Sequence, residues 1–334
     1  MSQVINARDT TRRPWNTFYA PIAEELEAVE ELLRHELTGN HPFVDSLVKH
    51  AFRLGGKRLR PALLLLSGKA AGQATREHIV LAAVVEMIHT ATLVHDDVLD
   101  EATIRRHRET VNARSDNEAS VLVGDFLFTH AFALASSLET TFACQTIGRS
   151  TNIVCAGEMR QIHARGNFAL TEAEYYSIID AKTAELCACC CRLGAHYAGT
   201  DPEVVEALER FGRHVGIAFQ IADDLLDLVG DEHLAGKSLG TDLEKQKLTL
   251  PLIRLLETTP ESGRRELIEM IRSESPGTRR AVAESLEQTG ALAYARAQAR
   301  RHAQTARDEL TALADGPARD VLVQLTELVV ARRE

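Results

Sequence analysis

Hydrophobic positions recur along this chain at the spacing of α-helices. Ile22, Leu26 and Val29 follow one another every three or four residues and predict an amphipathic helix over residues 20–38. The segment 79–94 is apolar on all sides, which is typical of a helix buried in the middle of a large protein. Turn signals, the first at residues 39–42, divide the rest into further predicted helices. One follows this turn and ends near Leu54, and others lie at residues 62–71, 75–100, 117–138, 142–163, 171–198 and 203–230, with several within 252–334.

Composition supports an all-α protein. The chain has 334 residues, of which 45% are hydrophobic and only 5% aromatic, so it can bury a large core while offering few typical strand residues. No linker or shift in composition interrupts it, and we expect a loose arm over residues 1–17 followed by one helical domain over residues 18–334, built as a large bundle with a central cavity. The formal charge of −10 argues against nucleic acid as a partner.

The sequence also indicates a cellular location. Residues 1–16 contain no apolar core segment, so they do not resemble a signal peptide, and we find no uncharged apolar stretch of about 20 residues that would span a membrane. Four of the six cysteines crowd residues 187–191, where neither a disulfide framework nor zinc spacing fits. We interpret the cysteines as small core residues of a soluble, cytoplasmic protein.

Two copies of the motif Asp-Asp-x-x-Asp end two apolar helical runs. The six carboxylates are those of Asp96, Asp97, Asp100, Asp223, Asp224 and Asp227. In the first copy Asp96 and Asp100 share a helix face one turn apart, with Asp97 turned aside. Carboxylates at a helix C-terminus oppose the helix dipole and repel each other, so local stability does not explain them. One copy alone is more typical of a solvated helix end, but two copies favour a cation site.

Magnesium suits these ligands. Oxygen-only donors select a hard cation, and magnesium completes its coordination with water and substrate phosphates after taking one or two carboxylates. Because the copies lie far apart in the sequence, only the fold can bring them together. Two facing clusters would hold an anionic diphosphate through shared magnesium ions.

Basic residues occur near both copies. Lys57, Arg58 and Arg60 follow two glycines directly ahead of an apolar helix, where guanidinium forks and helix amides suit phosphate oxygens. Arg105 and Arg106 follow the first acidic copy. A solvated basic loop and simple surface ion pairing are the alternative interpretations of these two groups.

These motifs together resemble the trans-polyprenyl diphosphate synthase family over nearly the whole chain. The matching residues are Gly-Gly-Lys-Arg-x-Arg-Pro at 55–61, His-Asp-Asp-x-x-Asp at 95–100 with Arg105-Arg106, Gly157-Glu158 with Gln161, Lys182-Thr183, Phe219-Gln220 with the second acidic copy, and 247–251. Within the family the chain is most similar to long-chain, octaprenyl-type enzymes. The resemblance implies the all-helical isoprenoid synthase type I fold, a homodimer, and head-to-tail condensation of isopentenyl diphosphate with an allylic diphosphate for quinone side chains.

The resemblance also implies roles for single residues. All six aspartates would hold magnesium, three ions with the bound diphosphate. Isopentenyl diphosphate would contact Lys57, Arg60, His89 and Arg106. The allylic diphosphate would contact Arg105, Lys182, Thr183, Gln220, Lys237 and Lys247. For His89, a satisfied core histidine is the alternative.

Two positions depart from the family pattern. His107 and Gln246 stand where relatives usually have glycine, so a left-handed backbone there would be strained or the loops rearranged.

Product length should depend on residues below the first acidic copy. Thr92 and Ala91 are small where short-chain relatives have aromatic residues, so we expect a tunnel that continues past Ile88 to a deeper floor. The floor candidates on the next helix are Phe128, Phe132 and Ala135. Ala91→Phe would then shorten the product, unless Ala91 is small only to let two helices pack. A farnesyl or geranylgeranyl diphosphate synthase, a terpene cyclase and a non-catalytic subunit of a heteromeric synthase remain open alternatives.

Overall fold

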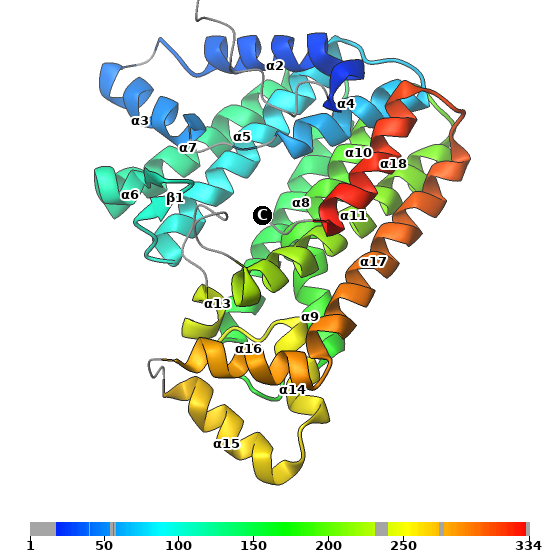
Figure 1. Ribbon diagram of the computed structural model, residues 1–334. Coiled ribbons are helices and arrows are strands. Elements are labelled where there is room, and N and C mark those ends of the chain that lie inside the picture. The colour runs from blue at the N-terminus through cyan, green and yellow to red at the C-terminus, as the bar shows by residue number, and fades with distance from the viewer. Residues whose placement is uncertain are drawn as a thin grey trace, which may run out of the picture.

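The computed structural model describes residues 18–39, 41–53, 56, 58–230, 240–273 and 277–331. The expected arm over residues 1–17 lies outside these ranges. Lys57 and Lys237, two of the expected binding residues, also lie outside them. The described residues form helices and one short hairpin (Figure 1). The prediction of an all-α protein is therefore confirmed, whereas the hairpin was not expected.

The elements follow the predicted order closely. The first half contains η1 (Ala20–Ile22), α2 (Ala23–Glu36), α3 (Pro42–Arg53), α4 (Leu59–Ala71), α5 (Arg76–Leu99), β1 (Ile104–Arg105), β2 (Arg108–Glu109), α6 (Val111–Arg114), α7 (Asn117–Ser136) and α8 (Phe142–His163). The second half contains α9 (Glu172–Ile179), η2 (Asp180–Ala184), α10 (Glu185–Tyr197), α11 (Pro202–Val229), α13 (Thr241–Glu244), α14 (Leu250–Thr258), α15 (Glu261–Arg272), α16 (Thr278–Gln288), α17 (Ala291–Glu309), η3 (Leu310–Ala312) and α18 (Pro317–Val330).

One predicted helix is interrupted. The segment expected as a single helix over residues 171–198 contains a π-helical turn, η2, between α9 and α10. The hydrogen bonds of such a widened turn have less favourable geometry than those of an α-helix, and π-helical turns occur frequently at functional sites. Lys182 and Thr183 lie within it.

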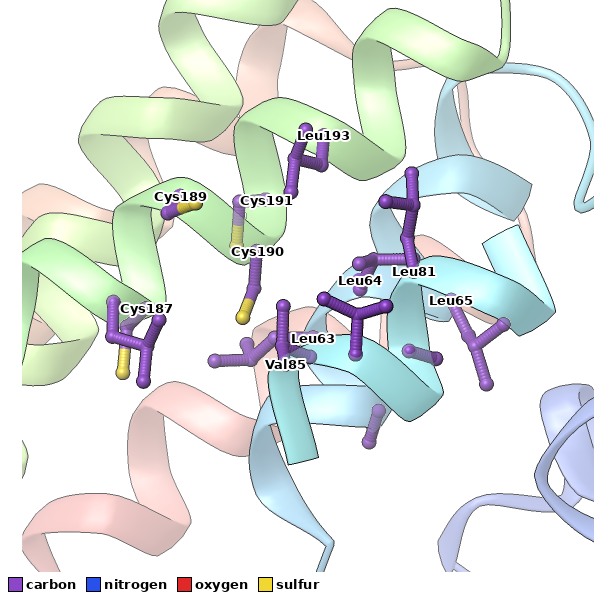
Figure 2. Close-up of a cluster of buried hydrophobic side chains, with 14 of the residues drawn as sticks. Leu63, Leu64, Leu65, Leu81, Val85, Cys187, Cys189, Cys190, Cys191 and Leu193 are labelled. Carbon is purple, nitrogen blue, oxygen red and sulfur yellow. The ribbon is translucent and has the colours of Figure 1, made fainter. Parts of the chain in front are cut away.

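The centre of the molecule is built on α5. Its residues from Leu81 to Ile88 are all buried, because apolar side chains cover every face of the helix. Figure 2 shows Leu81 and Val85 of α5 against leucines of α4 and the cysteines of α10. The cysteines are all free, and burial raises the pKa of the thiols of Cys189 and Cys190. The expectation of core cysteines is confirmed for residues 187–191 but is wrong for Cys155, whose side chain is exposed.

Two long helices join the two ends of the molecule. Figure 1 shows α2 and α3 at one end and α15 and α16 at the other. One apolar cluster gathers the helices near α5 and a second gathers α14 to α17, and both α11 and α17 contribute buried residues to each cluster. The single domain expected over residues 18–334 stays a prediction, supported by this shared core.

Two helices, α5 and α7, are long and apolar enough to cross a membrane by length and composition, which the sequence analysis did not expect. The difference arises because a window with a few charged residues still has a high mean hydropathy, 1.5 in α5 and 1.4 in α7. In α5, 72% of that window is buried inside the protein, as in any core helix, so α5 is explained by the fold. In α7 only 33% is buried, which leaves an apolar face without cover in this chain.

Candidate active site

A cavity of about 2280 Å³ gathers most of the residues that the sequence analysis singled out. The ends of α5 and α11, the start of α4, the hairpin and α18 contribute to its wall (Figure 1). The predicted site residues on the wall are Arg60, His89, Thr92, Asp96, Asp100, Arg105, Arg106, Phe128, Lys182, Thr183, Gln220, Asp223, Asp227 and Lys247.

The first acidic copy divides into residues on the wall and a residue behind it. Asp96 and Asp100, one helical turn apart, line the cavity, and burial raises the pKa of Asp96 to about 6. Asp97 is 1% exposed and lies behind the wall, where Arg105 Nε donates to its Oδ1 at 2.7 Å. Its Oδ2 is buried and has no hydrogen-bond partner among the described residues. Asp97 thus anchors the hairpin arginine instead of facing the cavity.

Asp100 is held by cations from two distant segments. Lys245 Nζ, just after α13, donates to both Oδ1 and the carbonyl oxygen of Asp100, and Arg165 Nη2 lies 3.3 Å from Oδ1. Burial alone would raise the pKa of Asp100, but these cations outweigh burial and lower it. The loop after the second acidic copy therefore contacts the first copy directly.

The second acidic copy, on α11, repeats the division. Asp223 and Asp227 line the cavity, although Asp227 is only 3% exposed and accepts hydrogen bonds from the Thr241 hydroxyl and the Asp242 amide. Asp224 lies off the wall, is 1% exposed and accepts hydrogen bonds from Tyr175 at 2.7 Å and Gln220 at 2.8 Å. Burial raises the pKa of Asp224 to about 6, even though Lys247 Nζ lies 3.6 Å away. The wall thus carries two aspartate pairs, each backed by a buried aspartate with protein partners.

A basic group lies on another part of the wall. Arg60 Nη1 lies 3.1 Å from His89 Nε2, and burial together with the nearby arginines holds the pKa of His89 well below its usual range. The imidazole is therefore neutral and accepts from Arg60. Gly56 has no side chain to fill the space against its backbone, and the Arg106 guanidinium occupies that space. Arg60, His89 and Arg106 thus converge on the loop that precedes α4.

Lys182 and Thr183 are fixed by their neighbours. Lys182 Nζ donates to Gln161 Oε1 at 2.7 Å and pairs with Glu158, while Thr183 donates to Gln220 at 2.7 Å. Gly157 permits this packing, since a Cβ there would lie 2.8 Å from the backbone nitrogen of Lys182. The π-helical turn is thereby seated against α8.

Both departures from the family pattern adopt the left-handed backbone. Arg106 and His107 have φ of 52° and 61° and form the two-residue turn between β1 and β2, where Arg105 is paired with Arg108. A type I′ hairpin turn requires positive φ at both positions. Gln246 has φ of 51°. The loops therefore keep the conformation that glycine would adopt, at a cost on the order of 1–3 kcal/mol for each residue.

The residues expected to set product length lie in two different places, the cavity wall and the core. Thr92 and Phe128 line the cavity, while Ile88, Ala91 and Ala135 are buried in the core and Phe132 packs against that core. None of these last four is on the cavity wall of the described structure. The physical reason for Ala91 is helix geometry, because five residues of α-helix rotate a side chain roughly 140° away from Asp96.

The sequence analysis missed several residues on the wall. Glu30, Glu86 and Asp242 contribute carboxylates, and the C-terminal helix α18 contributes apolar side chains. Glu86 carried a usable signal, since a glutamate within a continuous apolar run requires a partner. The residues of α18 carried none, because nothing in the sequence indicates which helix covers the cavity.

An all-helical fold whose cavity joins two aspartate pairs to separate groups of cations defines a class of enzymes that handle diphosphate substrates. The model of the family described as Polyprenyl synthetase matches residues 41–289. The chain belongs to this family and is a prenyltransferase.

Individual relatives support this assignment. The chain is 37% identical over 314 residues to the all-trans-nonaprenyl-diphosphate synthase (geranyl-diphosphate specific) of Rhodobacter capsulatus, covering 94% of this chain and 96% of that protein. It is 34% identical over 311 residues to the octaprenyl diphosphate synthase of Escherichia coli, covering 93% and 96%. A crystal structure of a Caulobacter crescentus polyprenyl synthase complexed with calcium and isoprenyl diphosphate superimposes with a TM-score of 0.91, at 33% identity, covering 96% of this chain and 98% of that one.

Replacing Tyr175 by phenylalanine should destabilise the protein, because it removes a hydrogen bond to the buried carboxylate of Asp224. We expect the free energy of unfolding to fall by about 1–3 kcal/mol. Tyr176→Phe is the matched control, since the hydroxyl of Tyr176 is buried without a hydrogen-bond partner among the described residues. Urea denaturation measures both variants, and equal effects would contradict the role assigned to Tyr175.

Proposed function

We propose that the protein catalyses magnesium-dependent, head-to-tail condensation of isopentenyl diphosphate with an allylic diphosphate, and that repeated condensation gives a long all-trans polyprenyl diphosphate for quinone side chains. The observation that carries this proposal is that two aspartate pairs and the separate group of Arg60, His89 and Arg106 line one cavity. The relatives from Escherichia coli and Rhodobacter capsulatus are an octaprenyl and a nonaprenyl diphosphate synthase, which supports an octaprenyl-like product.

The carboxylates on the wall fit a divalent cation. No group of three or more potential ligands among the described residues is arranged to hold an ion unaided, but magnesium needs one or two carboxylates and completes its shell with water and phosphate. Burial raises the pKa of Asp96, so a cation beside this carboxylate would stabilise its charged form. We propose Asp96, Asp100, Asp223 and Asp227 as direct ligands of three ions. Asp97 and Asp224, expected from the sequence to be ligands, would instead orient Arg105 and Lys247.

Bound magnesium would stabilise the negative charge that develops on the departing diphosphate. The protein would hold the allylic diphosphate with Arg105, Lys182, Thr183, Gln220 and Lys247, and isopentenyl diphosphate with Arg60, His89 and Arg106. Lys237 and Lys57 would complete these two sets from outside the described residues. The double bond of isopentenyl diphosphate attacks the allylic carbocation. The resulting intermediate then loses a proton to the released diphosphate. The cavity would have to exclude water from the cation during the reaction.

The alternatives fit less well. A terpene cyclase needs no second diphosphate pocket, whereas the grouping of Arg60, His89 and Arg106 supports one. A non-catalytic subunit usually loses an acidic copy, and this chain keeps both. We also propose that the enzyme is cytoplasmic, as its free cysteines suggest. Cell fractionation checks this location, and an enzyme recovered with the membrane fraction would count against it.

Asp96→Ala or Asp223→Ala should abolish condensation, because each removes a proposed metal ligand. The assay incubates labelled isopentenyl diphosphate with farnesyl diphosphate, with and without chelation of magnesium. Asp315→Ala, at an exposed position away from the cavity, is the control and should keep full activity. Near-normal turnover in either cavity variant would refute the assignment.

Arg106→Ala should mainly raise KM for isopentenyl diphosphate, and Arg105→Ala should mainly raise KM for the allylic partner. The two guanidinium groups lie apart, one against Gly56 and the other on Asp97. A lost charged hydrogen bond costs roughly 1.5–3 kcal/mol, which corresponds to about tenfold to over a hundredfold in affinity. Steady-state kinetics with each substrate varied measures the split, and identical effects on both substrates would disprove it.

A second copy of the chain would cover the exposed apolar face of α7. Val121 and Leu122 on this helix are 43% and 67% exposed, although large apolar side chains normally find cover. We propose a homodimer through this face. Leu122→Glu should yield monomers in size-exclusion chromatography with light scattering, whereas Leu122→Ala should remain dimeric. A monomeric wild-type protein would rule out the proposal.

Product length should respond to Thr92 and not to Ala91. Thr92 lines the cavity about 6 Å below Asp96 along α5, so Thr92→Phe narrows the path of the growing chain and should shorten the product. Ala91→Phe instead overpacks the core and should cost about 1–3 kcal/mol of stability. This replaces the expectation for Ala91 from the sequence. Product chromatography and thermal unfolding distinguish the two effects, and wild-type product length in Thr92→Phe would contradict the tunnel.

A further inference from the structure

Arg58 connects three helices beside the proposed isopentenyl diphosphate pocket. Its Nη1 donates to Glu86 of α5, while its Nε donates to Glu30 of α2 at 2.6 Å. Its own backbone caps the start of α4. Arg58, Glu30 and Glu86 all line the cavity. One guanidinium thus joins the N-terminal helix to the central helix at the mouth of the basic pocket.

The backbone of Arg58 is held in an unfavourable conformation. Its φ of 49° and ψ of 37° lie in the left-handed region, which non-glycine residues rarely occupy. Such a conformation persists when the surroundings over-determine it. The ion pairs of the Arg58 side chain with Glu30 and Glu86 supply that constraint. The left-handed turn sets the direction in which the chain enters α4, and Arg60 lies in the first turn of that helix.

Glu86 is the group that makes this pairing necessary. It is 2% exposed on α5 and lies three residues before His89, on the same side of the helix. Burial raises its pKa, and the positive charges of Arg58 and Arg60 oppose that rise. A buried carboxylate requires a cationic partner. Arg58 fulfils this requirement in the structure.

Arg60 is left available as a result. Its Nη1 contacts the neutral imidazole of His89, and its Nε is buried without a hydrogen-bond partner among the described residues. The described ion pairs include none between Arg60 and a carboxylate. Glu86 interacts electrostatically with Arg60 and would compete for its charge, but Glu86 is already paired with Arg58.

We propose that Arg58 is a positioning residue, which occupies Glu86 so that Arg60 stays directed at the diphosphate of isopentenyl diphosphate. This inference rests on the proposed function of the cavity. Without Arg58, Glu86 draws Arg60 away from the pocket. The loss therefore falls on one substrate, although Arg58 itself does not bind it.

Arg58→Gln tests the inference. We expect KM for isopentenyl diphosphate to rise about tenfold or more, while KM for the allylic substrate and kcat stay within about twofold. Adding Glu86→Gln to this variant removes the competitor, and KM for isopentenyl diphosphate should return to within about threefold of wild type. A purely structural role would not produce this recovery, because the double variant has lost both partners of the ion pair.

Two further variants test whether the rise in KM reflects poor folding or a general loss of stability. Arg58→Lys keeps a charge for Glu86 and should give a smaller rise in KM than Arg58→Gln, even if the latter folds poorly. Arg192→Gln breaks a partly buried ion pair with Glu209 that lies off the cavity wall. It should lower thermal stability without changing either KM.

Calorimetric titration with isopentenyl diphosphate separates this inference from the proposed function. Affinity should fall in Arg58→Gln and recover in the double variant, whether or not the preparation forms product. Equal losses for both substrates, or no recovery when Glu86 is also replaced, would overturn the positioning role while leaving the proposed function intact. A wild-type protein that binds no isopentenyl diphosphate would overturn both.

Discussion

The burial of carboxylates is the constraint that the rest of the site must satisfy. The ends of α5 and α11 bring six aspartates into and around one cavity, where burial weakens solvation of their charges. The protein answers with cations drawn from distant segments. Lys245 and Arg165 reach Asp100, Arg105 reaches Asp97, and Lys247 lies near Asp224. Arg105, Lys245 and Lys247, which follow the two acidic copies in the sequence, therefore lie against the helices that carry the aspartates.

This convergence explains where the backbone is strained. Arg106 and His107 turn the hairpin, and Gln246 ends the loop after α11, all with positive φ. These residues lie next to the cations that reach the acidic copies. Arg58, at the start of α4, and Glu101, just after α5, also have positive φ. The strained backbone is concentrated beside the charged side chains that line the cavity, as is common at functional sites.

The sequence predicted the helices and the paired aspartates well, because both depend on periodicity that a helix converts directly into faces. It could not show that Asp97 and Asp224 are buried, since that depends on Arg105 and Tyr175, which arrive from other segments. The hairpin and the π-helical turn were missed for a similar reason. Their backbone follows from tertiary contacts and not from local propensity. Ala91 was misplaced relative to the cavity because spacing along a helix was considered without its rotation.

The two proposed diphosphate pockets would solve opposite electrostatic problems. One is built from carboxylates and would gain affinity for an anion only after it binds metal, whereas the other presents Arg60 and Arg106 directly. The carboxylate of Glu86, set among the cations of the second pocket, would cancel part of that charge if it were unpaired. Its pairing with Arg58 keeps the sign of the pocket positive. The two proposed substrates would thus be distinguished by whether their diphosphate needs a metal ion, and the adjacent Arg105 and Arg106 would lie at the boundary between the two pockets.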